Sequence, residues 1–349
     1  MAKFRDTVKP LLFIGYLVGS LPHPSFVLEF FGNRFSKARL AKIAVTYSVL
    51  LYSILITLSA ECSVAFGRSI GINLKGVNLI AFRIYINFNI HYVVITFVLG
   101  IINAGRISRL VKSIAKYDDQ FRHVNLTSIV TPGFITLLLV SVFVVLLEMY
   151  RTHSALLLNW DRNTPPCLAM SLLPQLDFSL RLILTVVIPH VVFKAGVFII
   201  LASIGVLADA VSDRVASVAR DVETRLQMLV ESSGREVYTV AAGSLRNNNG
   251  YIDETEAGRV ICDCSLRVAK LKSLEKHLGQ CAGPILMVVL PMKIVELVTA
   301  VYLAAVVFFS KLENSPETLA LTIPTTAACV VLFFLSESGE RLLDAVSNT

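Results

Sequence analysis

Repeated apolar runs long enough to cross a bilayer are the feature that most constrains this chain. The clearest runs cover residues 43–60, 84–104, 129–147, 182–207, 278–310 and 318–336. An α-helix rises about 1.5 Å per residue, so about 20 such residues span a hydrocarbon core of roughly 30 Å. Unpaired backbone amides are costly in hydrocarbon, and the runs lack the alternating pattern of barrel strands. The sequence therefore predicts an all-α, polytopic membrane helix bundle with about six transmembrane helices.

The positions of the charges explain a net charge of +7 without a nucleic-acid partner. Only 16% of the residues are charged, against 55% hydrophobic ones, and the cations concentrate in short segments between the apolar runs. Such cations set the orientation of a membrane protein. We therefore expect the lipid bilayer, and no nucleic acid, as the macromolecular environment of this chain.

The distribution of Lys and Arg predicts which connections face the cytoplasm. The two basic segments contain Lys3, Arg5, Lys9, Arg34, Lys37, Arg39 and Lys42, and then Arg106, Arg109, Lys112, Lys116 and Arg122. The connection between the first and second runs carries Arg68 and Lys75 instead. The positive-inside rule then places both basic segments, and the N-terminus, in the cytoplasm. This predicts a multi-pass plasma-membrane protein whose polarity is opposite to that of G-protein-coupled receptors.

The predicted topology divides the chain into five parts. Residues 1–41 form a cytoplasmic N-terminal segment, 42–206 form transmembrane helices one to four, and 207–277 form a cytoplasmic helical hairpin. Residues 278–336 form transmembrane helices five and six, and 337–349 form a cytoplasmic tail. Within the first part, the apolar stretch 11–21 is too short to span and precedes Pro22 and Pro24, so it predicts an interfacial segment and not a cleaved signal.

Two apolar stripes at helical spacing predict the cytoplasmic hairpin. The first stripe contains Leu207, Val211, Val215, Val218, Val222, Leu226 and Leu229, and the second contains Ile261, Cys264, Val268, Leu271, Leu274 and Leu278. Their steps of three and four residues are those of a heptad-like seam. The first stripe continues out of the fourth run, and the second leads into the fifth. The stripes can pack against each other or against neighbouring subunits, and both readings stay open.

Ionisable residues inside the apolar runs are the candidates for a ligand site. A charge at mid-bilayer costs roughly 2.5 to 3.5 kcal/mol on insertion scales, so such residues face the bundle interior, a partner or water. They are His91, His190, Lys194, Lys293 and Glu296, and we group Asn87, Tyr92 and Tyr302 with them as polar residues at similar depth. We predict ligand contacts for His91, His190, Lys194, Glu296, Asn87 and Tyr302.

Other readings of these residues stay open. Lys293 and Glu296 are three residues apart on one helix, so they can neutralise each other as an ion pair, and Glu296 can pair with Lys194 instead. Asn87 and Tyr302 can hydrogen-bond to a neighbouring helix. A metal site of His91, His190 and Glu296 is disfavoured, because no helical ligand spacing supports it.

The sequence shows no catalytic constellation. It contains no nucleophile elbow, phosphate-binding loop, zinc-protease motif or dinucleotide-binding glycine pattern in a suitable context. The six cysteines have no paired metal-binding spacing. Cys62 and Cys167 fall in connections predicted to lie outside the cell, so a disulfide between them is one option and free thiols are the other. We expect a non-enzymatic protein with no catalytic residue, no metal and no cofactor.

Several segments resemble the insect gustatory and odorant receptor superfamily. The stretch Lys9, Pro10, Leu11, Leu12, Gly15, Gly19, Leu21 and Pro22 resembles the N-terminal segment of that family, and Arg109, Leu110, Val111, Tyr117, Asp118, Asp119 and Phe121 resemble its basic loop after the second span. The resemblance covers nearly the whole chain. It implies a gustatory-receptor-like subunit of a ligand-gated cation channel that detects a small-molecule tastant and assembles with itself or with other receptor subunits.

The sequence also departs from that family. Residues 279–283 (GQCAG) stand where an Asn and an aromatic residue are often found, and residues 337–349 resemble the stretch that leads to the seventh, pore-lining helix of the family. From this we expect that the sequence stops before that helix, and that conduction requires it.

Two other functional classes are also compatible with charged residues inside the membrane. A secondary transporter of a small solute needs such charges and interrupted helices, but it usually shows an internal repeat, and none is detectable between the two halves of this chain. A signalling receptor that acts independently of G proteins is the other alternative.

Overall fold

The computed structural model of the chain is mostly helical in the part it describes, which comprises residues 4–23, 37–71, 76–121, 171, 174–184, 188–241 and 254–309, with short stretches between 329 and 344. Its helices are α1 (Phe4–Leu17), α3 (Lys37–Gly71), α4 (Val77–Phe121), α7 (Phe178–Leu182), α8 (Ile188–Ala241) and α9 (Glu254–Phe309). No strand occurs among these described residues. The predicted all-α class is confirmed.

Four of the predicted spans correspond to these helices. Residues 43–60 lie in α3 and 84–104 lie in α4, while α8 contains 182–207 from Ile188 onward and α9 contains 278–310 up to Phe309. The predicted span 129–147 lies outside the described residues, and 318–336 is described only at separate positions. Segments within α3, α8 and α9 are long and apolar enough to cross a membrane.

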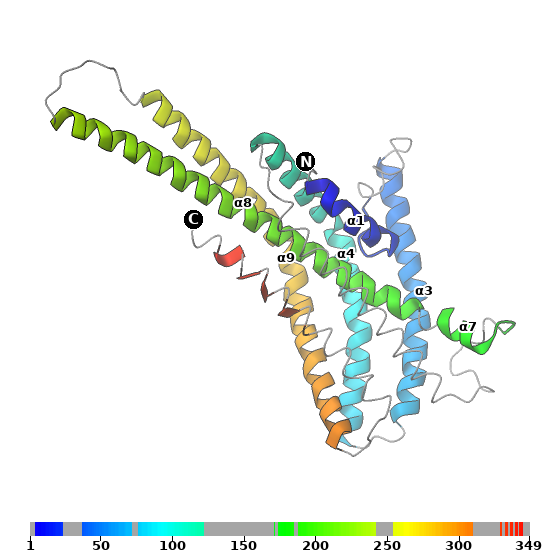
Figure 1. Cartoon of the computed structure of the whole chain (residues 1–349). Helices are drawn as coiled ribbons and strands as arrows, with labels where there is room; N and C mark the ends of the chain where they lie inside the picture. The colour runs from blue at the N-terminus through cyan, green and yellow to red at the C-terminus, as the bar shows by residue number, and fades with distance from the viewer. Residues whose placement is uncertain are drawn as a thin grey trace.

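Helices α4 and α8 form the centre of the bundle. Each packs on the other and on α1, α3 and α9, and α4 and α9 make the most extensive pairwise contact. Figure 1 shows α3, α4 and the second half of α9 running alongside one another, with α8 crossing them obliquely. Beyond this crossing, α8 and the first half of α9 continue together as a long projecting pair (Figure 1). Both helices thus extend well past the predicted spans.

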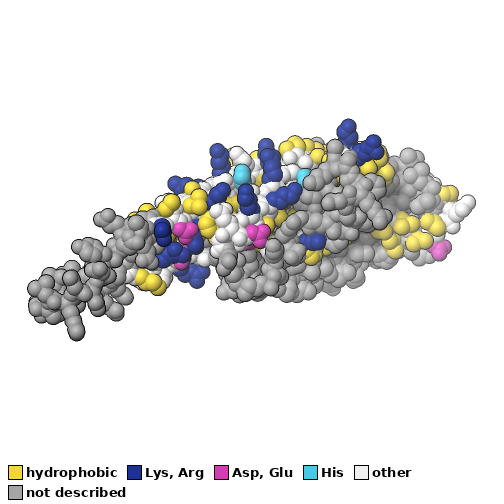
Figure 2. Space-filling model, turned by 90° about the horizontal axis from the view of Figure 1, so that it is seen from above, with side chains coloured by type: hydrophobic (Ala, Val, Ile, Leu, Met, Phe, Trp, Pro, Cys, Tyr) yellow, Lys and Arg dark blue, Asp and Glu magenta, His cyan; other side chains and the backbone are white. Residues whose placement is uncertain are grey.

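The exposed side chains change from apolar to basic at one end of the bundle. On α3, exposed Arg39 and Lys42 are followed by exposed Ile43 and other apolar residues. On α4, exposed Ile102 precedes exposed Arg106. Apolar surface that no part of the chain covers is stable in lipid, and the cations belong at the aqueous boundary. Figure 2 shows Lys and Arg side chains gathered on the face at this end of the molecule. We call it the basic end, and the positive-inside rule predicts that it faces the cytoplasm.

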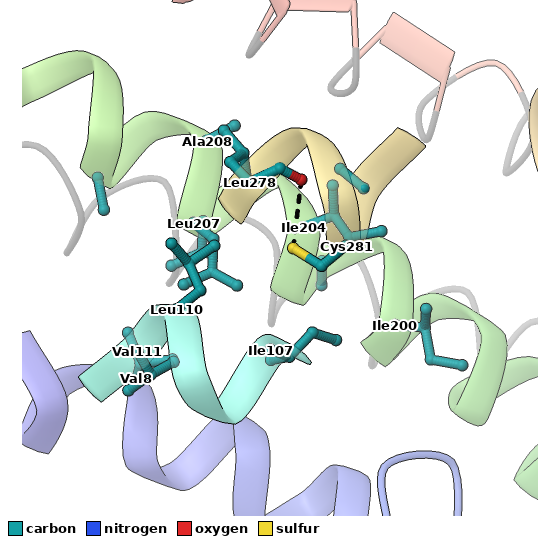
Figure 3. Close-up of a cluster of buried hydrophobic side chains, with 14 of the residues drawn as sticks. Val8, Ile107, Leu110, Val111, Ile200, Ile204, Leu207, Ala208, Leu278 and Cys281 are labelled. Atoms are coloured by element: carbon teal, nitrogen blue, oxygen red, sulfur yellow. Dashed lines mark hydrogen bonds between the residues drawn. The ribbon is translucent and has the colours of Figure 1, made fainter. Parts of the chain in front are cut away.

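The hydrophobic core lies where α1, α4, α8 and α9 meet near the basic end. Figure 3 shows Val8 of α1 beside Val111 of α4, with Leu207 of α8 next to Leu110 and with Leu278 and Cys281 of α9 close to Ile204. Because Phe4, Val8, Leu11 and Leu12 lie on one face of α1 and are all buried, the N-terminal helix is part of this core. The segment predicted to be interfacial therefore also contributes to packing inside the bundle.

The two predicted hairpin stripes differ in how far they are buried. In the first stripe, Leu207, Val211, Val215 and Val218 are buried. In the second, Leu271, Leu274 and Leu278 are buried, but Ile261 is 60% exposed and Val268 is also exposed. The reason is geometric, because α4 and α8 both pack against α9 within the bundle, whereas α8 is its main described neighbour along the projecting pair. The buried part of the second stripe is therefore the part nearest the bundle.

Small residues let the turn after α1 approach the transmembrane helices closely. Gly19 adopts a positive φ of 78°, which glycine accepts without strain, and it ends α1 so that the chain reverses toward α4. At Gly100 of α4, an added Cβ atom would overlap the backbone carbonyl of Ser20. At Gly196 of α8, it would overlap the hydroxyl of the buried Tyr52. Glycine is thus required at Gly100, where the obstacle is backbone, whereas a side chain at Gly196 would require the ring of Tyr52 to shift.

We predict that Gly100→Ala destabilises the bundle, because the new methyl group collides with the fixed backbone of Ser20. Overpacking of this kind costs about 1–3 kcal/mol. The measurement is the thermal unfolding of the purified protein in detergent. Gly279→Ala on α9 is the matched control, since nothing lies within 4 Å of the added atom, and its unfolding temperature should stay level or rise. Equal behaviour of the two variants would show that α1 does not dock as described.

Candidate functional site

The predicted ligand-site residues belong to three helices that pack against one another. Asn87 and His91 are in α4, His190 and Lys194 are in α8, and Lys293, Glu296 and Tyr302 are in α9. Helices α4, α8 and α9 contact each other pairwise. The side chains of Asn87, His91, His190, Lys194 and Glu296, and also of Tyr92, lie outside the described residues. The structure thus brings the three helices together and describes the side chains of Lys293 and Tyr302 on one of them.

Lys293 lies on the buried face of α9. It continues the row of buried residues Cys281, Ile285 and Val289 at a spacing of four, and its side chain is only 8% exposed. A lysine at this position brings a charged group into an otherwise apolar seam, which is costly unless the group is paired or hydrated. Glu296 is one helical turn further along, so its backbone position falls on the same face.

Tyr302 lies on another side of α9. It is nine residues beyond Lys293, which corresponds to about half a turn around the helix axis. Its side chain is 40% exposed. Within the described part of the chain, the helix register therefore separates Tyr302 from the buried face that carries Lys293.

A second group of charged residues, outside the predicted ligand site, lies near the basic end. The side chain of Arg214 on α8 is completely buried, and that of Asp118 on α4 is 15% exposed. Nε of Arg214 donates to Oδ1 of Asp118 at 2.8 Å, and Nη2 donates to Oδ2 at 2.6 Å. Nη1 donates to the carbonyl oxygen of Ala210. The guanidinium carbon lies 5.0 Å from the ring centroid of Phe4 on α1. Arg214 therefore joins three helices.

The geometry of this pair makes it a clamp. Two parallel N–H···O bonds match the planar guanidinium to both carboxylate oxygens, and the cation also faces an aromatic ring. Such an arrangement fixes the distance between α4 and α8 and also their register. Burial raises the pKa of the neighbouring Tyr117 from its ordinary value of 10 to about 12. Tyr117 is neutral at pH 7 at either value and adds no charge beside the pair.

A more exposed set of ion pairs joins α8 and α9 along the projecting pair. Nη1 of Arg267 lies 2.9 Å from Oδ2 of Asp221, and Nη2 lies 2.9 Å from Oδ2 of Asp263. Arg225 contacts Asp221 at 3.2 Å and Asp263 at 3.5 Å. The Arg267 guanidinium also lies 5.2 Å from the ring centroid of Phe121. Each pair of this kind contributes modestly, because water screens it.

The sequence did contain a signal for the buried clamp. Arg214 is seven residues after Leu207 and four before Val218, so it lies on the same helix face as the first hairpin stripe. An arginine on a buried face needs a carboxylate partner. Its partner is found in the Tyr117 to Phe121 segment, which entered the sequence analysis only through a family resemblance.

The described residues hold no group of three or more His, Cys, Asp or Glu side chains that is arranged to bind a metal ion. Cys262, Cys264, Cys281 and Cys329 are free thiols. Cys62 and Cys167, the candidates for a disulfide, have side chains outside the described part of the chain.

We predict that Asp118→Ala strongly destabilises the protein, because it leaves the buried Arg214 cation unpaired. Loss of one partner of a buried pair costs about 3–5 kcal/mol. The measurement is thermal unfolding in detergent. The double variant Asp118→Leu with Arg214→Met should recover most of the loss, since no charge stays buried. Glu223→Ala, which removes an exposed carboxylate of α8, is the control and should be nearly neutral. A mild Asp118→Ala phenotype would contradict the clamp.

A comparison with known families agrees with this architecture. The sequence model of the 7tm chemosensory receptor family matches residues 8–349, nearly the full length of the chain. A search of individually curated proteins finds no match to this chain. The long apolar helices and the exposed apolar surface next to the basic end are those of a multi-pass membrane protein. The chain belongs to the 7tm chemosensory receptor family.

Proposed function

We propose that the chain is a gustatory-receptor-like subunit of a ligand-gated cation channel in the plasma membrane, and that it detects a small-molecule tastant without catalysing a reaction. Family membership supports the chemosensory role. The observation that supports a ligand site within the bundle is Lys293, a nearly buried cation in the apolar second half of α9. Ionisable residues at such depth most often mark a ligand or ion pathway.

The proposed ligand site lies between α4, α8 and α9. Lys293 and Glu296 of α9, His91 of α4 and His190 of α8 belong to helices in mutual contact. Together they offer hydrogen-bond donors, an acceptor and charge to a polar small molecule. Asn87 and Lys194 are proposed as further contacts. Tyr302 is retained only as a contact on the outer side of α9, because its side chain is exposed and its register differs from that of Lys293.

The proposed mechanism is a shift between two helix arrangements. A tastant that binds one arrangement more tightly than the other increases the population of the first. The size of the shift is set by the ratio of the two affinities. The clamp between Arg214 and Asp118 ties α4 to α8, so the two helices would move together near the basic end. Rearrangement would then be concentrated in the segments between the clamp and the ligand layer, where Pro284 and Pro291 interrupt the hydrogen-bond ladder of α9.

We also propose that the projecting pair contacts other subunits. Ile261 and Val268 are exposed apolar residues seven positions apart, so they share one face of α9. That face lies on the part of α9 that ion pairs join to α8, and both side chains stay exposed there. Apolar side chains repeated at a heptad distance suit a helix in a neighbouring copy or in a related receptor subunit.

The decisive experiment separates a channel from a transporter and from a signalling receptor. We expect that excised membrane patches conduct cations when sugars, amino acids or plant alkaloids are applied, provided that the assembled receptor contains the seventh, pore-lining helix of the family. Excised patches lack cytosolic messengers, so a current there requires an ion pathway in the receptor complex itself. Solute uptake without current would favour a transporter. A current that occurs in whole cells and vanishes on excision would favour a signalling receptor.

We predict that Lys293 and Glu296 contribute to ligand sensitivity. The variants Lys293→Ala and Glu296→Ala each leave one buried charge without its counterpart if the two residues pair, and should lower surface expression. The double variant should restore expression but respond at shifted tastant concentrations. Cell-surface labelling and concentration–response curves measure the two effects. A double variant with normal expression and unchanged response would reduce the two residues to a structural pair and remove them from the ligand site.

A further inference from the structure

A strip of cations runs along the exposed face of α4 at the basic end. We call Arg106, Arg109, Lys112 and Lys116 the basic strip. All four side chains are exposed, while Ile107, Leu110, Ile114 and other residues of the opposite face are buried. The spacing of three and four residues keeps the strip on one side of the helix. Figure 2 shows Lys and Arg side chains concentrated on the face of the molecule at this end.

The strip begins where the lipid-facing surface of the same helix ends. Ile102, one turn before Arg106, is 58% exposed, and Val98, one turn earlier, is also exposed. The sequence between Val77 and Tyr117 contains no acidic residue. No described carboxylate forms an ion pair with Arg109, Lys112 or Lys116; the pairs found in that part of the chain belong to other arginines. The positive charge of the strip is therefore not neutralised by the described protein.

His23, in the turn after α1, flanks the strip. A Cβ atom on Gly105 would lie 3.9 Å from Cδ2 of His23, so the imidazole rests against α4 at the end of the strip where Arg106 lies. Burial, and then the charges of Lys112 and Arg109, lower the pKa of His23 to about 4. The imidazole is neutral at pH 7 for this reason. On the other side, Nη1 of Arg106 donates to the carbonyl oxygen of Gln280 on α9 at 3.0 Å. The strip is thus bordered by two other elements of the fold.

We propose that the basic strip binds the headgroup of a phosphoinositide in the adjacent membrane leaflet, with Arg109 and Lys112 as its principal phosphate contacts. The strip starts at the lipid boundary, so a headgroup anchored by its own acyl chains reaches it without leaving the bilayer. From Arg106 to Lys116 the helix rises about 15 Å. One phosphate would engage a single turn, whereas a headgroup with several phosphates contacts successive turns. Clusters of four or more cations just beyond a transmembrane helix suit such lipids.

The alternative occupants fit the observations less well. A soluble polyanion gains nothing from the exposed apolar side chains of Val98 and Ile102, which precede the strip on α4. An acidic protein segment would have to approach a surface that begins one helical turn from the lipid-facing Ile102. The membrane itself supplies an anion at this depth, and the uncompensated cations are arranged along the direction in which its headgroup projects.

The test uses the purified full chain in nanodiscs and native mass spectrometry of the lipids it retains. The nanodiscs contain phosphatidylcholine with phosphatidylinositol bisphosphate, or phosphatidylcholine with phosphatidylserine at equal total charge. We expect selective retention of the bisphosphate lipid. The double variant Arg109→Gln with Lys112→Gln should weaken binding of the bisphosphate lipid about 30-fold, because each cation near an anionic surface contributes roughly 1 kcal/mol. Arg220→Gln, which removes an exposed cation of α8, is the matched control and should retain the lipid normally.

Three outcomes would overturn the proposal. They are equal retention of phosphatidylserine, unchanged retention by the double variant, and displacement of the lipid by soluble inositol trisphosphate at comparable concentration. The last would assign the strip to a soluble polyanion. If the double variant does not elute as a single folded species, the single variants Arg109→Gln and Lys112→Gln replace it. Each of them should weaken retention about 5-fold.

Discussion

The buried pair of Arg214 and Asp118 is the interaction on which the arrangement of the helices depends. It lies where α1, α4 and α8 meet, and its guanidinium is satisfied by a carboxylate, by a carbonyl of its own helix and by the ring of Phe4. The apolar core around it supplies most of the favourable burial. That core alone sets no single register, whereas the pair has one geometry that satisfies both partners. The positions of α4, α8 and the N-terminal helix follow from that geometry.

The bilayer explains why the remaining surface has its composition. Exposed apolar residues such as Met287 and Val298 on α9 would promote aggregation in water. In hydrocarbon they are at no disadvantage, and the drive for helices to associate must come from close packing and polar contacts. This is why Gly100 admits the turn after α1 against α4, and why Gly196 admits Tyr52 of α3 against α8.

Hydrophobicity and charge along the sequence predicted the features of the fold that depend on whether lipid or water surrounds a segment. The existence of α3, α4, α8 and α9, and the change from lipid-facing to basic surface, follow from local composition. The extent of hairpin burial did not follow, because Ile261 and Val268 have the same periodicity as the buried Leu271. Periodicity shows that a face is apolar but not which helix covers it.

The sequence alone does not determine which side chains meet at the candidate site, because this depends on how the helices pack against one another. Lys293 was singled out by its charge, and the structure places it on the buried face of α9. Tyr302 was grouped with it by depth alone, and the helix register separates the two. The partner of Arg214 is 96 residues away along the chain, a separation at which no local pattern constrains which carboxylate meets which cation.

An apolar pair of similar volume in place of Arg214 and Asp118 could be as stable as the ion pair, because the desolvation cost of two buried charges offsets much of their attraction. The ion pair differs from an apolar pair because it excludes other registers of the two helices. Sliding α8 by one residue against α4 would leave both charges buried without partners, whereas aliphatic side chains would tolerate many such displacements. Among the described side chains of α8, that of Arg214 is the one that is both charged and buried, so it is the residue that makes such displacements costly. The clamp is therefore best understood as the residue pair that selects one register among several well-packed ones.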